Sequence, residues 1–239
     1  MDHENAFNQW KKRCFSKVDI SKKGSIDDDI YHIVSLINVS SNYFTTSSCS
    51  GRIILVEGLS ESSKVQKQNI SWLFVSHQKC KEEDVVLALQ KASGSAVLKF
   101  EPFVLHVQCK DIGSARLLHS VAVSSGFRNS GVSIGKRGKI IMAVRSTHCL
   151  EVPLGHKGEI LVNENYIHFL VQIANQKMAE NLNRIKRFYD GLQAALQADE
   201  SPCVAKDKHQ NKKRCLESAA EKDKRLSYGR KPNSPKQVK

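Results

Sequence analysis

The chain has 239 residues, and its 37 lysines and arginines exceed its 24 acidic residues to give a net charge of +13 at pH 7. Hydrophobic residues make up 40% of a chain long enough to bury a core, which excludes disorder throughout. No run approaches the roughly 18 apolar residues of a membrane-spanning helix, so we expect no membrane segment. The basic charge favours a nucleic acid or another polyanion as partner.

Cysteine usage argues for a reducing compartment. The seven cysteines contain no Cys-x-x-Cys pair, and a structural zinc site takes paired ligands from tight turns, so we expect no metal site. The polar first ten residues do not resemble a secretory signal. An odd number of cysteines without such a signal predicts free thiols in a cytosolic or nuclear compartment, and we expect a cytoplasmic protein.

Two helices are predicted at the start of the chain. Apolar residues recur at helical spacing between Phe7 and Phe15, and again between Ile26 and Ile37. Ser25 is the expected N-cap of the second helix. The acidic triplet 27–29 would lie in its first turn, where it favours the helix dipole. Adjacent helical residues point in different directions, so we interpret the triplet as helix-stabilising and not as a metal site.

The middle of the chain changes to the pattern of strands. Short β-branched or aromatic runs occupy residues 52–56, 71–75, 96–100, 103–107, 131–134 and 139–144. Two shorter helices interrupt them, one over Glu82–Lys91 and one from an Asp111 N-cap to a Gly126 C-cap. This order predicts the α+β (α/β) class, with a mixed β-sheet flanked by helices.

The longest helix comes last. An apolar stripe runs from Ile167 to Leu192 behind an expected Asn163 N-cap. Beyond it the chain is charged, rich in proline and poor in large apolar residues, which is typical of disorder. We therefore predict one folded domain over 1–197 and a disordered basic tail over 198–239.

Three familiar nucleotide or RNA motifs are absent or misplaced. Gly131–Arg137 has too few residues between its glycines for a Walker loop and lacks the Ser/Thr that follows the lysine there. Gly135-Lys136-Arg137-Gly138 matches the GxxG of a KH domain but joins two strand-like runs, so we interpret it as a hairpin turn. No Gly-x-Gly-x-x-Gly follows a strand, which argues against a Rossmann methyltransferase fold.

A run of small hydroxyl-bearing residues, Tyr43–Arg52, precedes an apolar strand. Small side chains let backbone N–H groups approach a ligand, and the Arg52 guanidinium offers a bidentate fork for a phosphate or a carboxylate. The alternative is a serine-rich turn with no ligand. Cys49 has no obvious local base, so covalent catalysis is disfavoured.

Six blocks in order along the chain resemble the tRNA wybutosine-synthesising protein 3 family over about residues 5–195. They are Ser47–Ile53, Trp72–His77, Phe100–Val107, Gly126–Gly131, Val144–Thr147 and Val152–Gly155. The resemblance implies an enzyme that uses S-adenosyl-L-methionine to methylate the N4 nitrogen of the tricyclic wybutosine precursor, 7-aminocarboxypropyl-demethylwyosine, beside the anticodon of phenylalanine tRNA. It also implies a fold other than the Rossmann methyltransferase fold.

Methyl transfer from a sulfonium requires alignment of the two reactants, exclusion of water and a base for the nitrogen's proton. We expect His106 or His77 as the base, although a structural histidine is the common alternative. Residues expected to bind the methyl donor are Ser48, Ser50, Gly51, Arg52, Asn129 and Ser130. Whether the serine-rich run holds the donor's carboxylate or a tRNA phosphate stays open here. Arg145 and Trp72 are the candidates for substrate contact.

Two rival functions belong to other classes. One is a non-catalytic RNA-binding module whose serine-rich loop grips phosphate. The other is a cysteine hydrolase built on Cys49. Binding of S-adenosylmethionine separates the first rival from the methyltransferase, and substitution of Cys49 separates the second.

Overall fold

The structure is a computed structural model that describes residues 3–16, 24–58 and 70–200. The residues fall into two units, 1–196 and 197–239. All elements below belong to the first unit, except that the last helix continues to Glu200. The predicted disorder of the tail concerns residues that lie almost entirely outside the described ranges, so it stays a prediction. None of the described helices is long and apolar enough to cross a membrane.

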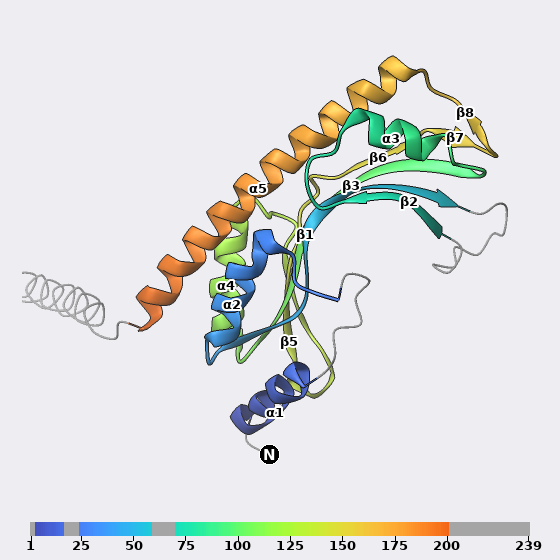
Figure 1. The fold of residues 1–239 in the computed structure, drawn as a ribbon. Helices are drawn as coiled ribbons and strands as arrows, with labels where there is room; N and C mark the ends of the chain where they lie inside the picture. The colour runs from blue at the N-terminus through green and yellow to red at the C-terminus, as the bar shows by residue number, and fades with distance from the viewer. Residues whose placement is uncertain (1–2, 17–23, 59–69, 201–239) are drawn as a thin grey trace, which may run out of the picture. The chain divides into compact units, whose positions relative to one another are not determined.

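The main sheet has six strands in the order β2-β1-β3-β5-β4, with β6 also paired to β3 (Figure 1). The strands are β1 (Tyr43–Gly58), β2 (Ile70–Ser76), β3 (Ser95–Cys109), β4 (Gly131–Ile134), β5 (Ile140–Val144) and β6 (Leu150–Pro153). A small second sheet pairs β7 (Gly155–His156) with β8 (Glu159–Ile160). The predicted α+β class is confirmed. Every described pair is antiparallel, whereas the sequence suggested a mixed sheet.

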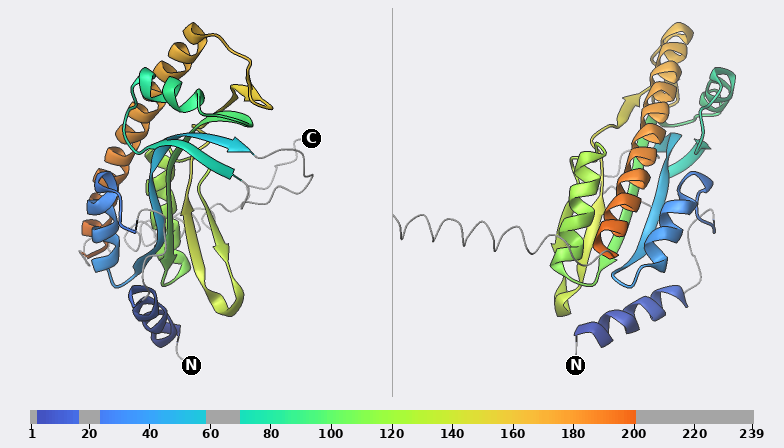
Figure 2. Two further views of the ribbon diagram at one scale, coloured as in Figure 1. Left: turned by 45° about the vertical axis from the view of Figure 1, so that its right-hand side comes forward. Right: turned by 90° about the vertical axis from the view of Figure 1, so that its left-hand side faces the viewer.

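The helices are α1 (His3–Phe15), α2 (Tyr31–Val39), α3 (Glu82–Leu89), α4 (Ile112–Ser124) and α5 (Glu164–Glu200), with short 3-10 turns η1 (Asp28–Ile30) and η3 (Lys136–Gly138). Figure 2 shows α5 running between α4 and α2 on one side of the main sheet. There α2 packs on β1 and α4 packs on β5.

The core consists of two clusters along α5. One joins α2, α4 and the C-terminal half of α5 to β3 and β5, with Phe103, Phe127 and Phe188 in mutual ring contact. The other joins α3 and the N-terminal half of α5 to β1 and β3. The predicted apolar stripe of the long helix therefore covers both halves of the sheet.

Two predicted helix caps are confirmed and one is wrong. The Asp111 side chain accepts from Ser114 N at 2.7 Å, and the Asn163 side chain accepts from Tyr166 N at 2.9 Å. Ser25 caps nothing, because the helical turn η1 begins only after Asp27. The predicted hairpin turn at 135–138 is confirmed, since β4 and β5 pair on either side of η3.

The serine-rich run is not a loop, as the sequence suggested, but the first half of β1. The whole strand β1 pairs with β3 from Tyr43 to Gly58, and a register shift lies between Thr45 and Ser47. Its hydroxyl residues face a β3 stretch rich in β-branched and apolar side chains, and these cross-strand pairs stabilise an extended chain.

The two strands predicted at 96–100 and 103–107 are one continuous strand, although Pro102 lies between them. A proline has no N–H for the ladder and usually ends a central strand. Pro102 is opposite Gly51, whose φ of +105° also disturbs the pairing. Asn181 of α5 compensates by accepting from Phe103 N at 2.8 Å and donating to Ser50 O at 2.7 Å. Its side chain thus replaces the missing backbone bonds.

Candidate active site

The site begins where β2 stops covering β1. β2 pairs only with Ile53–Gly58, so the backbone of β1 before Ile53 meets other partners on that edge. The N–H of Ser50 donates to the Asp27 carboxylate at 2.8 Å. Asp27 comes from the segment just ahead of η1, is only 6% exposed, and makes no side-chain cap to that turn. A buried carboxylate is thus fixed against the strand.

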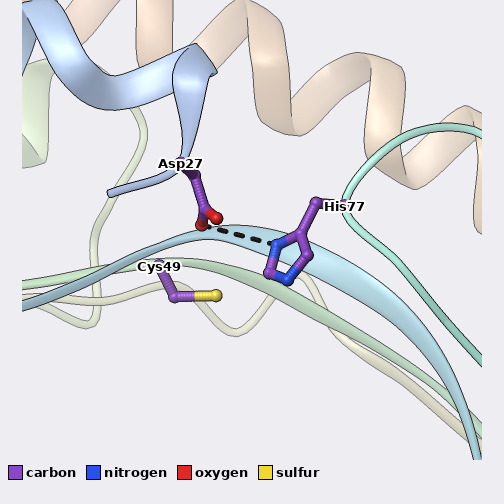
Figure 3. A group of neighbouring side chains, drawn as sticks. All are labelled: Asp27, Cys49 and His77. Carbon is purple, nitrogen blue, oxygen red and sulfur yellow. Dashed lines mark ion pairs between the residues drawn. The ribbon is translucent and has the colours of Figure 1, made fainter. Parts of the chain in front are cut away.

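His77 is the third residue of the site. It directly follows Ser76, the last residue of β2, which pairs with Ile53 and so brings His77 to the edge of β1 near Ser50. Its Nδ1 lies 3.4 Å from the Asp27 carboxylate (Figure 3). In the same view the side chain of Cys49 extends from β1 beneath the imidazole. The ligand-type atoms of the three residues all lie within 4.8 Å of one another. A carboxylate beside one nitrogen of an imidazole is the arrangement that orients a general base.

Cys49 is a protonated thiol and not an activated nucleophile. Burial raises its pKa most, and the carboxylates of Asp27 and Glu101 raise it further against the lowering effects of the Gly51 backbone and Arg52. A thiolate is the reactive form of cysteine, and a raised pKa removes it at neutral pH. The raised pKa of the Cys49 thiol therefore argues against the hydrolase hypothesis, even though a histidine lies nearby.

Arg52, two residues after Ser50, is engaged on both sides. Its Nε donates to the Glu101 carboxylate at 2.7 Å, and its guanidinium lies 4.6 Å from the centre of the Trp72 ring. The carboxylate and the indole together hold the guanidinium in one place beside the strand. Arg52 and Trp72 thus offer a ligand a positive charge held in place against an aromatic ring.

The two serines that flank Cys49 differ in their environment. Ser50 is 1% exposed, and its hydroxyl donates only to Gly51 O at 3.5 Å. Its backbone N–H and carbonyl, bound by Asp27 and Asn181, fix the strand in place. Ser48 is half-buried. Only Ser48 therefore presents a hydroxyl that a ligand could reach.

A second polar network includes His106, the other histidine that the sequence suggested. Arg145 Nη2 contacts His106 Nε2 at 2.9 Å, and Ser47 Oγ lies 2.8 Å from His106 Nδ1. Burial, and then the Arg145 charge, lower the pKa of His106. Arginine has no acceptor, so His106 Nε2 accepts and Nδ1 carries the proton of the neutral ring.

The residues Asn129 and Ser130 belong to the Arg145 end of the sheet. The hydroxyl of Ser130 accepts from Arg145 N at 3.1 Å, and Asn129 is exposed. The sequence-predicted set therefore divides. One group gathers with Asp27 and Cys49, namely Ser48, Ser50, Gly51, Arg52, Trp72 and His77. The other gathers around Arg145, namely His106 and Ser130, whereas Asn129 is the exposed chain neighbour of Ser130.

Sequence reasoning missed Asp27 as a member of the site. It placed the whole acidic triplet inside a helix, whereas only Asp28 and Asp29 lie in the first turn of η1. The apolar stripe did not show that Asp27 lies outside the helix, because it fixes the start of a helix only to within a few residues. The same three-residue cluster could also hold a metal ion, which the cysteine spacing did not suggest.

Comparison with known proteins identifies the family. A family model described as methyltransferase TYW3 matches residues 9–194. The chain belongs to this family. As a member of the TYW3 methyltransferase family it is an enzyme, which disfavours the hypothesis of a non-catalytic RNA-binding module.

Curated relatives cover most of the chain. The tRNA wybutosine-synthesizing protein 3 homolog of Danio rerio is 63% identical over 203 residues, 85% of this chain and 81% of that protein. The homolog of Homo sapiens is 55% identical, over 83% of this chain and 77% of that protein. A Pyrococcus abyssi protein named tRNA(Phe) 7-((3-amino-3-carboxypropyl)-4-demethylwyosine(37)-N(4))-methyltransferase 2 is 36% identical, over 72% of this chain and 82% of that protein.

Solved structures support the same fold. The PH1069 protein from Pyrococcus horikoshii aligns with a TM-score of 0.71 at 35% sequence identity, over 80% of this chain and 97% of that one. The TYW3 family fold is thus an antiparallel sheet with helices, and the expectation of a fold other than the Rossmann methyltransferase fold is confirmed.

Proposed function

We propose that the protein methylates the N4 nitrogen of the tricyclic 7-aminocarboxypropyl-demethylwyosine of phenylalanine tRNA, with S-adenosyl-L-methionine as donor, as a step of wybutosine biosynthesis. Family membership and the name of the Pyrococcus abyssi relative support the reaction. The observation that carries the proposal is the contact of half-buried His77 with the buried Asp27 carboxylate, which is held against the serine-rich half of β1.

The charges at this site fit the methyl donor. S-adenosylmethionine carries a positive sulfur, a carboxylate and an ammonium group, and when bound it supplies an electrophilic methyl group. Asp27 and Glu101 offer carboxylates, and Arg52 offers a guanidinium fixed over Trp72. We assign the donor's carboxylate to Arg52 and the hydroxyl of half-buried Ser48. Gly51 lets the backbone approach closely there, and Ser50 acts through its backbone.

His77 is the proposed general base. The Asp27 carboxylate lies 3.4 Å from Nδ1 of the ring, an ion-pair contact without hydrogen-bond geometry, and Nε2 would accept the proton that N4 must lose as its lone pair attacks. The proton moves from N4 to Nε2, the N4 lone pair forms the new N–C bond, and the pair of the broken S–C bond stays on sulfur. The resulting imidazolium is stabilised by the Asp27 carboxylate at 3.4 Å.

His106 is the less suitable of the two histidines for this role. Its Nε2 already accepts from Arg145 and its Nδ1 donates to Ser47, so neither nitrogen is available to a substrate. We assign His106 and Ser130 to holding Arg145 in place for contact with the tRNA, and exposed Asn129 to direct contact with a ligand. Trp72 of β2, whose ring lies against the Arg52 guanidinium, would contact the substrate base toward the opposite edge of the sheet from Arg145.

The partner proposed here, phenylalanine tRNA, agrees with the net charge of +13, since neutralised phosphates supply most of the sequence-independent affinity. The basic stretch 198–239 would add non-specific attraction to RNA, and the reaction would take place in the cytoplasm. Deletion of 198–239 is therefore expected to weaken tRNA binding and to leave donor affinity unchanged.

The reaction is tested with purified full-length protein, S-adenosylmethionine and phenylalanine tRNA from cells that lack this protein. Mass spectrometry of the digested tRNA is expected to show the tricyclic base gaining the mass of one methyl group. His77→Gln and Asp27→Asn are expected to reduce kcat by about 10²–10⁴-fold, the usual contribution of a positioned base. Asp28→Asn, which changes the exposed neighbour of Asp27, is the matched control and should retain full activity.

Two results would contradict the proposal. The methyltransferase reaction would be contradicted if the mass of the tRNA stayed unchanged and titration of S-adenosylmethionine into the protein gave no saturable heat. Full activity in His77→Gln would leave the reaction standing but remove the assigned base.

A further inference from the structure

A cavity of about 430 Å³ lies where α4, β5 and α5 come together. Its wall carries three arginines, Arg128, Arg184 and Arg187, and several hydroxyl residues, including Ser125, Ser146 and Thr147. Among the residues that the structure describes, no carboxylate lines it. The proposed methyl transfer uses none of these side chains.

Three separate segments build the cavity. The helix α4 ends at Ser124, and the chain turns sharply at Gly126, whose φ is +102°. A Cβ at Gly126 would make only ordinary contact with Arg184, at 3.5 Å, so the positive φ and not a lack of space favours glycine at this turn. The end of α4 and the residues after β5 both supply hydroxyls, and α5 supplies Arg184 and Arg187, which are three residues apart and share a face.

Both α5 arginines are held in place before any ligand binds. Arg184 donates to the Glu180 carboxylate at 2.9 Å, to Ser146 Oγ at 3.1 Å and to Gly126 O at 3.4 Å. Arg187 donates to the same carboxylate at 3.1 Å and to Ser125 O at 3.4 Å. Fixed guanidinium groups lose little entropy when they bind an oxyanion.

The charge around the cavity is not balanced. One carboxylate, Glu180, serves two arginines, and its hydrogen bond from Arg184 lowers its pKa, so it stays ionised. Arg128 adds a third positive charge. Burial, and then the charges of Lys177 and Arg184, lower the pKa of the nearby His148, so the positive potential extends beyond the wall. An anion is the ligand that this charge would attract.

We propose that this cavity binds a phosphate group of the tRNA backbone. The inference rests on the proposed function only for the identity of the RNA. Guanidinium groups and hydroxyls are the side-chain groups that contact phosphate oxygens in protein–nucleic acid complexes. Several fixed donors around one concave site match a tetrahedral phosphate better than a planar acceptor.

The carboxylate of the methyl donor is the other oxyanion to consider, and two observations disfavour it. It carries an adjacent ammonium group, which three guanidinium groups would repel and no wall carboxylate would bind. The cavity also lies beside α4 and β5, whereas Asp27, Cys49 and His77 lie at the β1–β2 edge, with β3 between these two parts of the sheet. The donor's methyl group must reach the second location.

The RNA would be guided from the cavity to the reacting base. Ser146 lines the cavity, and the residue before it, Arg145, contacts His106, which contacts Ser47 of β1. Ser47 is two residues before Cys49 on the same strand. A line of polar groups therefore connects the two sites across β5, β3 and β1.

The test compares Arg187→Gln and Arg128→Gln with Lys186→Gln in the full chain. Lys186 is exposed on the same helix, so its substitution removes the same charge without touching the cavity. Arg184 is left intact because it also supports the Gly126 turn. Affinity for phenylalanine tRNA is measured over a range of KCl concentrations, and affinity for S-adenosylmethionine by calorimetry.

Each cavity variant is expected to weaken tRNA binding by about tenfold, as the loss of a charged hydrogen bond does, and to lower the slope of log K against log[KCl] by about 1. Lys186→Gln should change neither quantity, and donor affinity should be unchanged in all three variants. Equal effects of the cavity and control variants would overturn the inference. A loss of donor affinity with intact tRNA binding would overturn it too, and would assign the cavity to the donor's carboxylate.

The outcome is separable from that of the proposed function. tRNA affinity is read without methyl transfer, so a cavity-dependent loss of affinity supports the phosphate site even if no methylated base is found. Conversely, if the cavity variants methylate tRNA and bind it as tightly as the unaltered protein does, the proposed reaction stands and the proposed phosphate site is wrong.

Discussion

The side-chain amide of Asn181 donates to the carbonyl oxygen of Ser50 at 2.7 Å, and so ties the middle of α5 to the strand that carries the candidate active site. The same side chain accepts from Phe103 N at 2.8 Å. Both backbone groups lie in a stretch where Pro102 and Gly51 interrupt the ladder of β1 and β3. One buried amide thus sets the position of Ser50, whose N–H in turn binds Asp27.

Asn181→Ala is expected to lower both stability and activity. Two buried backbone groups would lose their partner, at about 1–3 kcal/mol each. Because Ser50 would also lose its anchor, kcat/KM for methyl transfer should fall. Asn175→Ala is the matched control, since Asn175 makes the same kind of bonds from α5 to Cys80 N and O, at 2.9 Å each. It should cost stability alone, as measured by urea unfolding, and an equal loss of activity in both variants would contradict the special role of Asn181.

Gly51→Ala is expected to destabilise the protein by about 2 kcal/mol, because the residue has a φ of +105° and the new Cβ would meet its surroundings. That atom would lie 2.9 Å from Asn181 Nδ2 and 3.0 Å from Glu101 O. Gly58→Ala, at the other end of the same strand, has open space around its Cβ and should unfold within about 0.5 kcal/mol of the unaltered protein. Urea midpoints that move equally in the two variants would contradict this explanation.

The titration of His106 should be visible in the NMR signal of its ring. Its pKa is expected below the ordinary value of about 6.5, mainly because of burial and secondly because of Arg145. Arg145→Gln should raise the pKa only in part, since burial remains. A full return to the ordinary value would make the Arg145 charge the main cause instead.

The same shift has a consequence for stability. Because the folded-state pKa of His106 is depressed, the unfolded chain binds a proton more readily below about pH 6.5. The stability that the neutral ring contributes is therefore present above this pH and is lost as the pH falls through the folded-state pKa. Urea midpoints at pH 7.5 and pH 5 should differ less for His106→Gln than for the unaltered protein.

Zinc should inhibit the enzyme by occupying Asp27, Cys49 and His77, whose ligand atoms lie within 4.8 Å of one another. A metal there would block the base that we assign to His77. Because the pKa of the Cys49 thiol is raised, inhibition should strengthen with rising pH, as the thiol must lose its proton to bind. Cys49→Ala should weaken zinc inhibition and retain most activity, and a chelator should leave the basal rate unchanged. Loss of activity on chelation, restored by zinc, would instead make the metal part of the enzyme.

The elements that the sequence predicted well are those with a local cause. The hydrophobic stripe of α5, the Asp111 and Asn163 caps and the hairpin at 135–138 each depend on residues a few positions apart. The ordered blocks were also sufficient to identify the family. The serine-rich run was predicted as a turn, whereas it is the first half of β1, and its part in a site stays a prediction.

Tertiary structure decided what depends on residues distant in the chain. Asp27 looked like one of three equivalent helix-stabilising carboxylates until the strand edge that receives it was known, and Cys49 lacked a base because His77 follows a strand that pairs only with the far half of β1. The continuity of β3 through Pro102 depends on an amide from α5. Local propensity and spacing fix the elements of this protein, but the partners of its buried polar groups follow from packing, which no short stretch of sequence contains.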